Sequence, residues 1–126
     1  MEDIYVVTSK GITKKHEAID GIVREISTRE ELEELIERMP YIQTIQAPNG
    51  KARKELYQLA MNEYDDVNWV KVIKSVYLRM ADHRYDEFEP NYMERAKNFL
   101  YKEIAIRFNL PFEEVENFVN DTIKNT

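Results

Sequence analysis

Hydrophobic residues recur along most of this chain at the three- and four-residue spacing of amphipathic helices. Between Asp66 and Met80 they occupy more than one side of the predicted helix. The main stripe holds Trp69, Val70, Ile73, Val76, Tyr77 and Met80, while Val72 and Leu78 lie off it. Because at least two neighbours must cover such a helix, we predict that residues 66–80 form the centre of the fold, with Trp69 in its core.

Two helices are predicted before this central one. A capping box of Ser27 with Glu30, or of Thr28 with Glu31, starts the first helix, and Pro40 ends it. Its predicted buried stripe is Leu32, Leu35, Ile36 and Met39, with an acidic run on the solvated face. The second helix runs from Lys51 to about Glu63 with Asn49 as its N-cap. Its predicted inward positions are Ala52, Leu56, Leu59 and Ala60 or Glu63.

Two helices are predicted after the central one, which Asp65-Asp66 caps. Pro90 is placed as the first residue of a helix that reaches Phe108. One of its stripes is Met93, Ala96, Leu100 and Ile104, and the other is Tyr92, Phe99 and Ile106. Asn109 suits a left-handed C-cap, and Pro111 opens a last helix. The stripe of that helix is Val115, Phe118, Val119, Thr122 and Ile123.

The N-terminal segment has the composition of β-strands instead. Residues 4–8 are β-branched and aromatic, Ser9-Lys10-Gly11 signals a turn, and residues 12–19 could return as a second strand. Since an isolated hairpin is marginal in water, it must lean on the helices, pair with another chain or be what remains of a larger sheet. Its exposed edge would be a candidate partner-binding site, including a homodimer through the hairpin. The residues of this edge are Ile4, Tyr5, Val6 and Val7.

These segments predict a mainly α fold, a compact bundle of about five helices with a short N-terminal β hairpin. The expected division is a hairpin at residues 1–20 and a helical domain at residues 21–126. The 126 residues are 43% apolar and 33% charged, which is typical of a globular protein. No apolar run reaches the roughly 18–20 residues of a membrane helix, and no signal-peptide pattern is present. A cytoplasmic protein without membrane contact is the expectation.

The composition also argues against several kinds of functional site. There is no cysteine, two widely separated histidines make a histidine metal site unlikely, and three glycines fit no phosphate-binding loop motif. We therefore expect no metal and no cofactor. The net charge of -6 argues against nonspecific binding of nucleic acid by the whole molecule, but leaves a local basic face open. No carboxylate pair lies within an apolar stripe; Glu103 comes closest, and it is expected to pair with a Lys or Arg. No enzyme is expected.

Four segments carry a resemblance to a known family: residues 23–26 with the capped acidic helix after them, residues 69–79, residues 96–105 and residues 110–115. Their order resembles the helical C-terminal domain of the CarD/CdnL/TRCF family of bacterial transcription regulators, from about residue 20 to the end. In that family a Tudor-like β domain binds the RNA polymerase β subunit, and the helical domain touches promoter DNA. The resemblance implies that residues 1–20 are a remnant of the Tudor-like, polymerase-interacting module.

The same resemblance points to the loop between the first two helices as the approach to DNA. Family members that stabilise open promoter DNA insert a tryptophan from this loop, whereas here the loop holds Gln43, Thr44, Ile45, Gln46, Ala47 and Pro48 without an aromatic residue. The candidate DNA-binding residues are Gln46, Lys51, Arg53 and Lys54, with Lys71 and Lys74 as a second stripe. The alternative for these basic residues is a solvated or polar helix edge.

The leading hypothesis is thus a transcription regulator that acts without catalysis by binding RNA polymerase, promoter DNA or both. The alternative is a protein-interaction or dimerisation module without DNA binding, motivated by the net charge, the missing loop aromatic and the unfinished hairpin.

Overall fold

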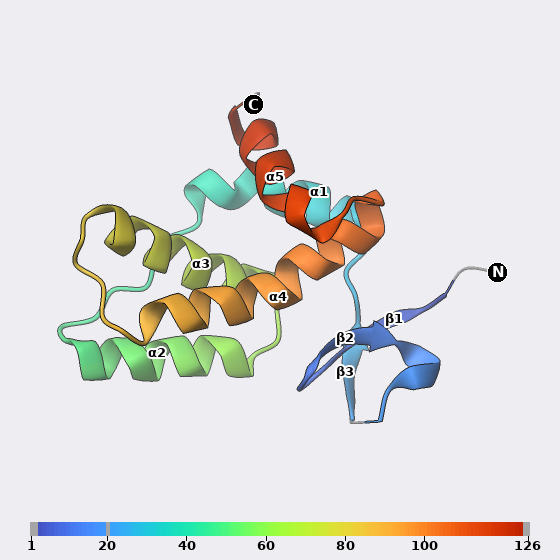
Figure 1. Cartoon of the computed structure of the whole chain (residues 1–126), viewed down its shortest axis with the longest axis horizontal. Helices are drawn as coiled ribbons and strands as arrows, with labels where there is room; N and C mark the ends of the chain where they lie inside the picture. The colour runs from blue at the N-terminus through green and yellow to red at the C-terminus, as the bar shows by residue number, and fades with distance from the viewer. Residues whose placement is uncertain (1–2, 20, 125–126) are drawn as a thin grey trace. The chain divides into compact units, whose positions relative to one another are not determined.

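The computed structural model describes residues 3–19 and 21–124, without the side chains of residues 123 and 124. The prediction of a mainly α fold with a small N-terminal β element is confirmed (Figure 1). The strands are β1 (Tyr5–Thr8), β2 (Gly11–Lys14) and β3 (Ile22–Glu25). The helices are α1 (Arg29–Arg38), α2 (Gly50–Asn62), α3 (Asp66–Ala81), α4 (Glu89–Phe108) and α5 (Val115–Lys124). Short 3-10 turns, η1 to η3, cover Lys15–Glu17, Met39–Tyr41 and Phe112–Glu114.

The chain divides into two compact units. Unit 1 contains the described residues of 1–37 and 101–126, and unit 2 contains residues 38–100. Helix α4 contributes to both. This division does not coincide with the boundary that the sequence suggested between residues 20 and 21, because the strand that follows residue 21 completes the N-terminal sheet.

The sheet of unit 1 has three antiparallel strands in the order β2-β1-β3. The predicted hairpin is therefore incomplete: β3 pairs with the other side of β1, through Val7 opposite Arg24. Strand β2 is also shorter than expected, since it ends at Lys14 and the polar residues after it form the turn η1. As the central strand, β1 buries both Val6 and Val7 completely.

Helix α1 starts with the second of the two predicted capping boxes. The Glu31 amide donates to Thr28 Oγ1 at 3.1 Å, and the Thr28 amide donates to Glu31 Oε1 at 2.9 Å, so two amides of the first turn are satisfied. The predicted stripe Leu32, Leu35 and Ile36 is buried. In α5 the stripe residues Val115 and Val119 are buried, while the Ile123 side chain lies outside the described part.

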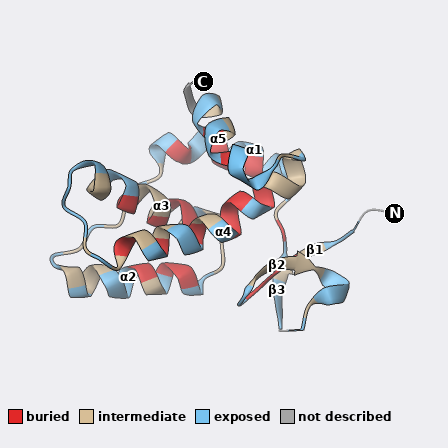
Figure 2. Cartoon of the chain, in the orientation of Figure 1, coloured by how far each residue is buried: buried red, intermediate tan, exposed pale blue. Residues whose placement is uncertain are grey.

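Unit 2 is built around α3, as predicted. Trp69 is completely buried and its ring stacks on Phe99, with centroids 4.8 Å apart and planes 12° from parallel. Asp65 caps the helix, accepting the Asn68 amide at 2.8 Å. Figure 2 shows buried positions along α2, α3 and α4. One predicted stripe residue, Tyr77, instead faces outward with 64% of its surface exposed.

The inward face predicted for α2 is wrong at two positions. Leu56 and Leu59 are 37% and 61% exposed, and the buried residues are Tyr57, Ala60 and Met61. Tyr57 decides the rotation of the helix, because its ring packs near Phe88 and Tyr92 and its hydroxyl bonds to a buried carboxylate. Helix α2 therefore buries the face that carries Tyr57, whose hydroxyl has a buried hydrogen-bond partner, and exposes the face that carries Leu56 and Leu59.

Candidate nucleic-acid interface

The first turn of α2 carries the predicted basic triplet. Asn49 caps the helix by accepting the Ala52 amide at 2.9 Å, as expected. Lys51 and Lys54 are exposed. Arg53 is not, because its guanidinium bonds to Asp86 at 3.1 Å and its side chain is only 11% exposed. The triplet therefore divides into two exposed lysines and one arginine that joins α2 to the segment before α4.

Lys74, a predicted DNA contact, is occupied inside unit 2. Its ammonium donates to three backbone oxygens, those of Met39, Pro40 and Ile42, at 2.9, 3.1 and 2.7 Å. This is the full donor capacity of an ammonium group. Lys74 thus fastens the end of η2 to α3, and phosphate binding would require it to release these carbonyls. Lys71, one turn earlier, is half-buried.

The loop of residues 42–49 runs beside α3. The Ile45 amide donates to Ser75 Oγ at 2.8 Å, and that hydroxyl donates in turn to the Lys71 carbonyl at 2.5 Å. Gln46 is exposed, and its side-chain amide donates to Thr44 Oγ1 at 2.8 Å. The loop is therefore anchored in its middle and displays Gln46 outward.

A buried carboxylate organises the other end of the same surface. Glu89, the first residue of α4, is completely buried. Its oxygens accept the Tyr57 hydroxyl at 2.8 Å, the Arg79 Nε at 3.0 and 3.1 Å and the Asp86 amide at 2.9 Å. Arg79 also donates to the Arg84 carbonyl. We call Glu89, Tyr57 and Arg79 the Glu89 cluster; it ties α2, α3 and α4 together.

The two acids of the Glu89 cluster have pKa values shifted in opposite directions. Burial acts to raise the pKa of Glu89, but the hydrogen bonds from Asp86, Arg79 and Tyr57 outweigh it and hold that pKa below its usual 4.5. Burial, helped by the hydrogen bond to the Glu89 carboxylate, raises the pKa of the Tyr57 hydroxyl. Glu89 is thus an anion at neutral pH and Tyr57 its neutral donor, an arrangement that fits a structural ion pair.

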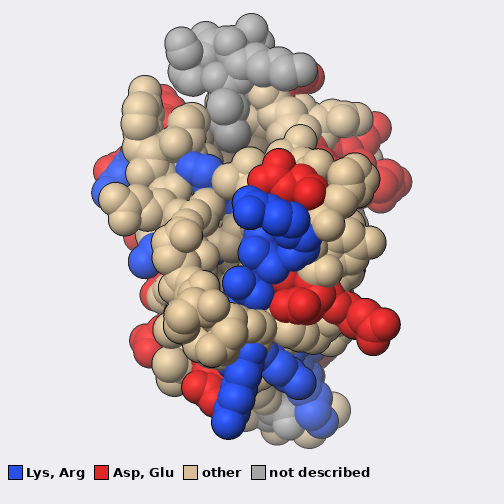
Figure 3. All heavy atoms as spheres, turned by 90° about the vertical axis from the view of Figure 1, so that its left-hand side faces the viewer, with Lys and Arg blue, Asp and Glu red and all other residues tan. Residues whose placement is uncertain are grey.

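Charge along the chain distinguishes this surface from the rest of the protein. Residues 38–54 and 67–81 contain seven Lys and Arg residues and no Asp or Glu, whereas all other residues together hold 11 basic and 24 acidic ones. The first stretch is the loop with the start of α2, and the second is nearly all of α3. Figure 3, which faces the end where α2 begins, shows Lys and Arg side chains gathered there with Asp and Glu beside them.

This local charge asymmetry is a feature of the sequence that motif analysis missed. It needed no structure to be seen, only a count of charges by segment. The Glu89 cluster was missed for another reason: a glutamate before a proline signals a helix start, and nothing in the sequence distinguishes a buried capping carboxylate from a solvated one.

The predicted partner-binding edge is not available on β1. Ile4 is 48% exposed and Tyr5 is partly exposed, but Val6 and Val7 are buried and β1 is paired on both sides. The outer strands of the sheet are β2 and β3. Strand β3 displays Ile22 and Val23, each 47% exposed, so an apolar edge exists on the strand that the prediction did not include.

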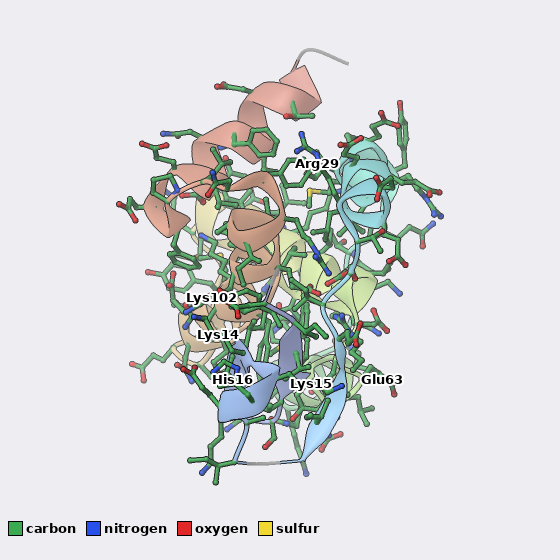
Figure 4. The ribbon with its side chains drawn as sticks, turned by 90° about the vertical axis from the view of Figure 1, so that its right-hand side faces the viewer. Lys14, Lys15, His16, Arg29, Glu63 and Lys102 are labelled. Atoms are coloured by element: carbon green, nitrogen blue, oxygen red, sulfur yellow. The ribbon has the colours of Figure 1, made fainter. Side chains whose placement is uncertain are left out.

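Basic side chains also lie at the other side of this sheet. Lys14, at the end of β2, pairs with Asp3 at 3.3 Å, and His16 lies 3.8 Å from Glu17 (Figure 4). These neighbouring acids raise the pKa of Lys14 and balance part of the local charge. The neighbouring acids therefore neutralise part of the positive charge of this group.

Glu103 was the carboxylate that the sequence placed nearest to an apolar stripe. As expected, it forms an ion pair, with Arg24 as its partner. It is completely buried, and its carboxylate accepts Arg24 Nη1 at 2.9 Å and the Ser27 amide at 2.8 Å. Arg107 donates to the Ser27 carbonyl at 2.8 Å. These bonds hold the segment between β3 and α1 against the second half of α4.

No protein-family model and no curated protein sequence matches this chain. Over the described residues, none of the helices combines the length and the apolar character needed to span a membrane. Across the same residues, no group of three or more histidine or carboxylate side chains is positioned to hold a metal ion.

Proposed function

We propose that this protein is a CarD-like regulator of bacterial transcription, acting in the cytoplasm without catalysis by binding promoter DNA, RNA polymerase or both. One observation supports the DNA contact above all: residues 38–54 and residues 67–81, which make up all of α3 after Asp66, contain seven Lys and Arg residues and no Asp or Glu, in a protein with a net charge of -6. Phosphate neutralisation supplies most of the affinity of proteins for DNA, so a surface of this kind is where a strand would bind.

Lys51 and Lys54 are the residues proposed to contact phosphates. Both are exposed, although the Lys54 ammonium lies 5.8 Å from the centroid of the Phe88 ring. Lys51 lies in the first turn of α2, whose backbone dipole also favours an anion, and Lys54 follows directly after that turn. Gln46, displayed by the anchored loop, is proposed as a neighbouring polar contact. Arg53 and Lys74 have partners within unit 2, so their proposed part is to hold the loop and helix in place.

The experiment is a polarisation assay of the full chain on forked promoter DNA over a range of salt concentrations, with and without RNA polymerase. Replacing Lys51 and Lys54 with alanine should reduce the slope of log affinity against log salt by about 0.9 per lost phosphate contact, or about two in all. The matched control replaces Lys15 and Lys102, two exposed lysines of unit 1 labelled in Figure 4, and should leave the slope unchanged. Absence of binding in either setting would contradict the proposal.

A specific observation also favours the alternative, a protein-interaction or dimerisation module. The sheet has two outer strands, and β3 combines an outer backbone edge with the exposed side chains of Ile22 and Val23. A partner strand, including the polymerase β subunit that the family resemblance suggests, would extend the sheet there. Light scattering that gives a monomer at every concentration, together with clear DNA affinity, would count against this alternative.

A further inference from the structure

Asn49 and Gly50 form the only Asn-Gly pair in the sequence. In such a pair the backbone nitrogen of the glycine can attack the side-chain amide of the asparagine, because the glycine has no side chain to hinder a close approach. Each of the other eight asparagines is followed by a residue that carries a side chain. Asn49 is therefore the position where the sequence most favours loss of the side-chain amide, a reaction called deamidation.

The start of α2 requires both residues of this pair. Asn49 has an extended backbone, with φ of -155° and ψ of 174°, and its side-chain oxygen caps the helix by accepting the Ala52 amide. A Cβ atom added to Gly50 would lie only 2.9 Å from Asp86 Oδ2, and Arg53 binds that same carboxylate at 3.1 Å. Since a side chain at position 50 would disturb this ion pair, the cap and the close approach of Asp86 together place an Asn-Gly pair here.

The reacting groups are accessible and lie in a favourable electrostatic environment. Asn49 is exposed and Gly50 is half-buried. The Gly50 amide is the first of α2, so it has no acceptor within the helix, and the positive end of the helix dipole favours loss of its proton. The Ala52 amide, 2.9 Å from Asn49 Oδ1, is a donor already directed at the oxygen that becomes negative when Cγ turns tetrahedral.

We propose that Asn49 is a site of spontaneous deamidation in the folded protein. The Gly50 nitrogen forms a bond to Asn49 Cγ and loses its proton, the side-chain nitrogen leaves as ammonia, and the product is a cyclic succinimide. Water then opens the ring. Cleavage of the bond from nitrogen to Cγ gives aspartate, and cleavage of the bond from nitrogen to the main-chain carbonyl carbon gives isoaspartate. Overall, one amide and one water become one carboxylate and one ammonium ion.

The reaction adds a negative charge two residues before Lys51. Aspartate is as good an N-cap as asparagine, and the helix dipole favours its charge, so α2 stays folded in this product. Charges this near to one another are little screened by salt, and the new carboxylate therefore opposes the binding of a phosphate by Lys51. This consequence rests on the proposed function, whereas the deamidation itself does not.

The first experiment follows every asparagine by peptide mapping and mass spectrometry while the full chain is incubated at neutral pH, folded or unfolded in urea. In the folded chain the peptide that contains Asn49 should gain one mass unit before any other peptide, as a mixture of aspartate and isoaspartate. This gain should be at least as fast as in urea. Asn49→Ser keeps a capping oxygen but has no amide, so its peptide should not change in mass.

A folded chain in which Asn49 keeps its amide, or loses it more slowly than in urea, would overturn the proposal. That result would show that the bond to the Ala52 amide protects the side chain instead of assisting the reaction. Fluorescence of Trp69 verifies that the incubated chain and the serine variant are folded.

The second experiment measures the consequence for binding to forked promoter DNA. Asn49→Asp, which is one of the two products, should reduce the slope of log affinity against log salt by about 0.9, the effect of losing one phosphate contact. Asn49→Ser should keep the parent's slope. Asn62→Asp, which adds the same charge at an exposed position at the other end of α2, is the matched control and should keep it too.

The two proposals fail in different ways. If the parent protein binds no DNA, alone or with polymerase, the proposed function is refuted, and mass spectrometry alone decides the deamidation. If the parent binds DNA and Asn49→Asp keeps its slope, the effect of the new charge on binding is refuted.

Discussion

Replacing Glu89 with glutamine tests how unit 2 is held together. The carboxylate receives three donors, from Tyr57, Arg79 and the Asp86 amide, in a site closed to water. Glutamine keeps the size of the side chain but has one acceptor oxygen, and its NH2 group would point a donor at other donors. It also leaves Arg79 without its counter-charge.

The magnitude follows from this geometry. Breaking a buried ion pair by removing one partner costs roughly 3–5 kcal/mol. Arg79 keeps 24% of its side chain exposed, so water screens part of the loss and the lower end, about 3 kcal/mol, is expected. With a urea m value of about 1.5–2 kcal/mol/M, the unfolding midpoint should fall by about 1.5–2 M.

Urea unfolding followed by Trp69 fluorescence is the assay, because this buried tryptophan belongs to the same unit as Glu89. Glu87→Gln, an exposed glutamate two residues earlier, is the control and should leave the midpoint unchanged. A fall of less than about 0.5 M in Glu89→Gln, at the m value assumed above, would refute the view that the Glu89 cluster stabilises unit 2.

The loss of stability in Glu89→Gln should depend on pH. The folded pKa of Glu89 lies below the usual 4.5, so its ionisation contributes stability that is fully present above that value. This contribution is lost as pH falls through the folded pKa, because the unfolded chain takes up the proton first. The stability difference between the parent and Glu89→Gln should therefore be constant near neutrality and shrink below about pH 4.5. A difference that grows toward acid pH would contradict this assignment.

Two further predictions concern the other polar anchors. Glu103→Gln removes the buried carboxylate that binds Arg24 and the Ser27 amide, so the α1 amides should become less protected against hydrogen exchange. Glu113→Gln, at an exposed glutamate, is the control and should leave this protection unchanged. Equal protection of α1 in the two variants would contradict the prediction. Lys74→Met keeps most of the length of the side chain but leaves three carbonyls without their donor. Hydrogen exchange should therefore increase in residues 39–45 and not in α2. Unchanged exchange in residues 39–45 would show that Lys74 does not hold this segment against α3.

The sequence predicted the helices because their information is local. Asn49 and Asp65 cap the helices that they were expected to cap, Asn109 takes the left-handed conformation with φ of 53°, and Trp69 lies in the core. Capping and periodicity depend on a few neighbouring residues, so these predictions required no knowledge of the tertiary fold.

The predictions were wrong where the local sequence allows two arrangements and a contact between residues far apart in the chain selects one of them. Helix α2 has an apolar stripe through Leu56 and Leu59 and another through Tyr57 and Met61, and the hydroxyl bond from Tyr57 to Glu89, 32 residues away, selects the second. The third strand was missed because four residues without alternation give little periodic signal until β1 is present to pair with them.

The candidate site divides in the same way. The position of the basic turn after Asn49 was predictable, but the partners of its residues were not. Arg53 and Lys74 read as exposed cations in the sequence, and long-range acceptors, the Asp86 carboxylate and the carbonyls that follow α1, engage both. Local sequence patterns do not reveal which acceptors the fold brings within reach.

The central claim is that the surface of unit 2 that carries Lys51 and Lys54 binds DNA, and the salt dependence of binding to forked promoter DNA tests it most directly. The account predicts measurable affinity for the parent protein, alone or with polymerase, and a slope of log affinity against log salt that falls by about two when Lys51 and Lys54 become alanine. A slope that is the same in the parent, in this variant and in the Lys15 and Lys102 control would contradict it.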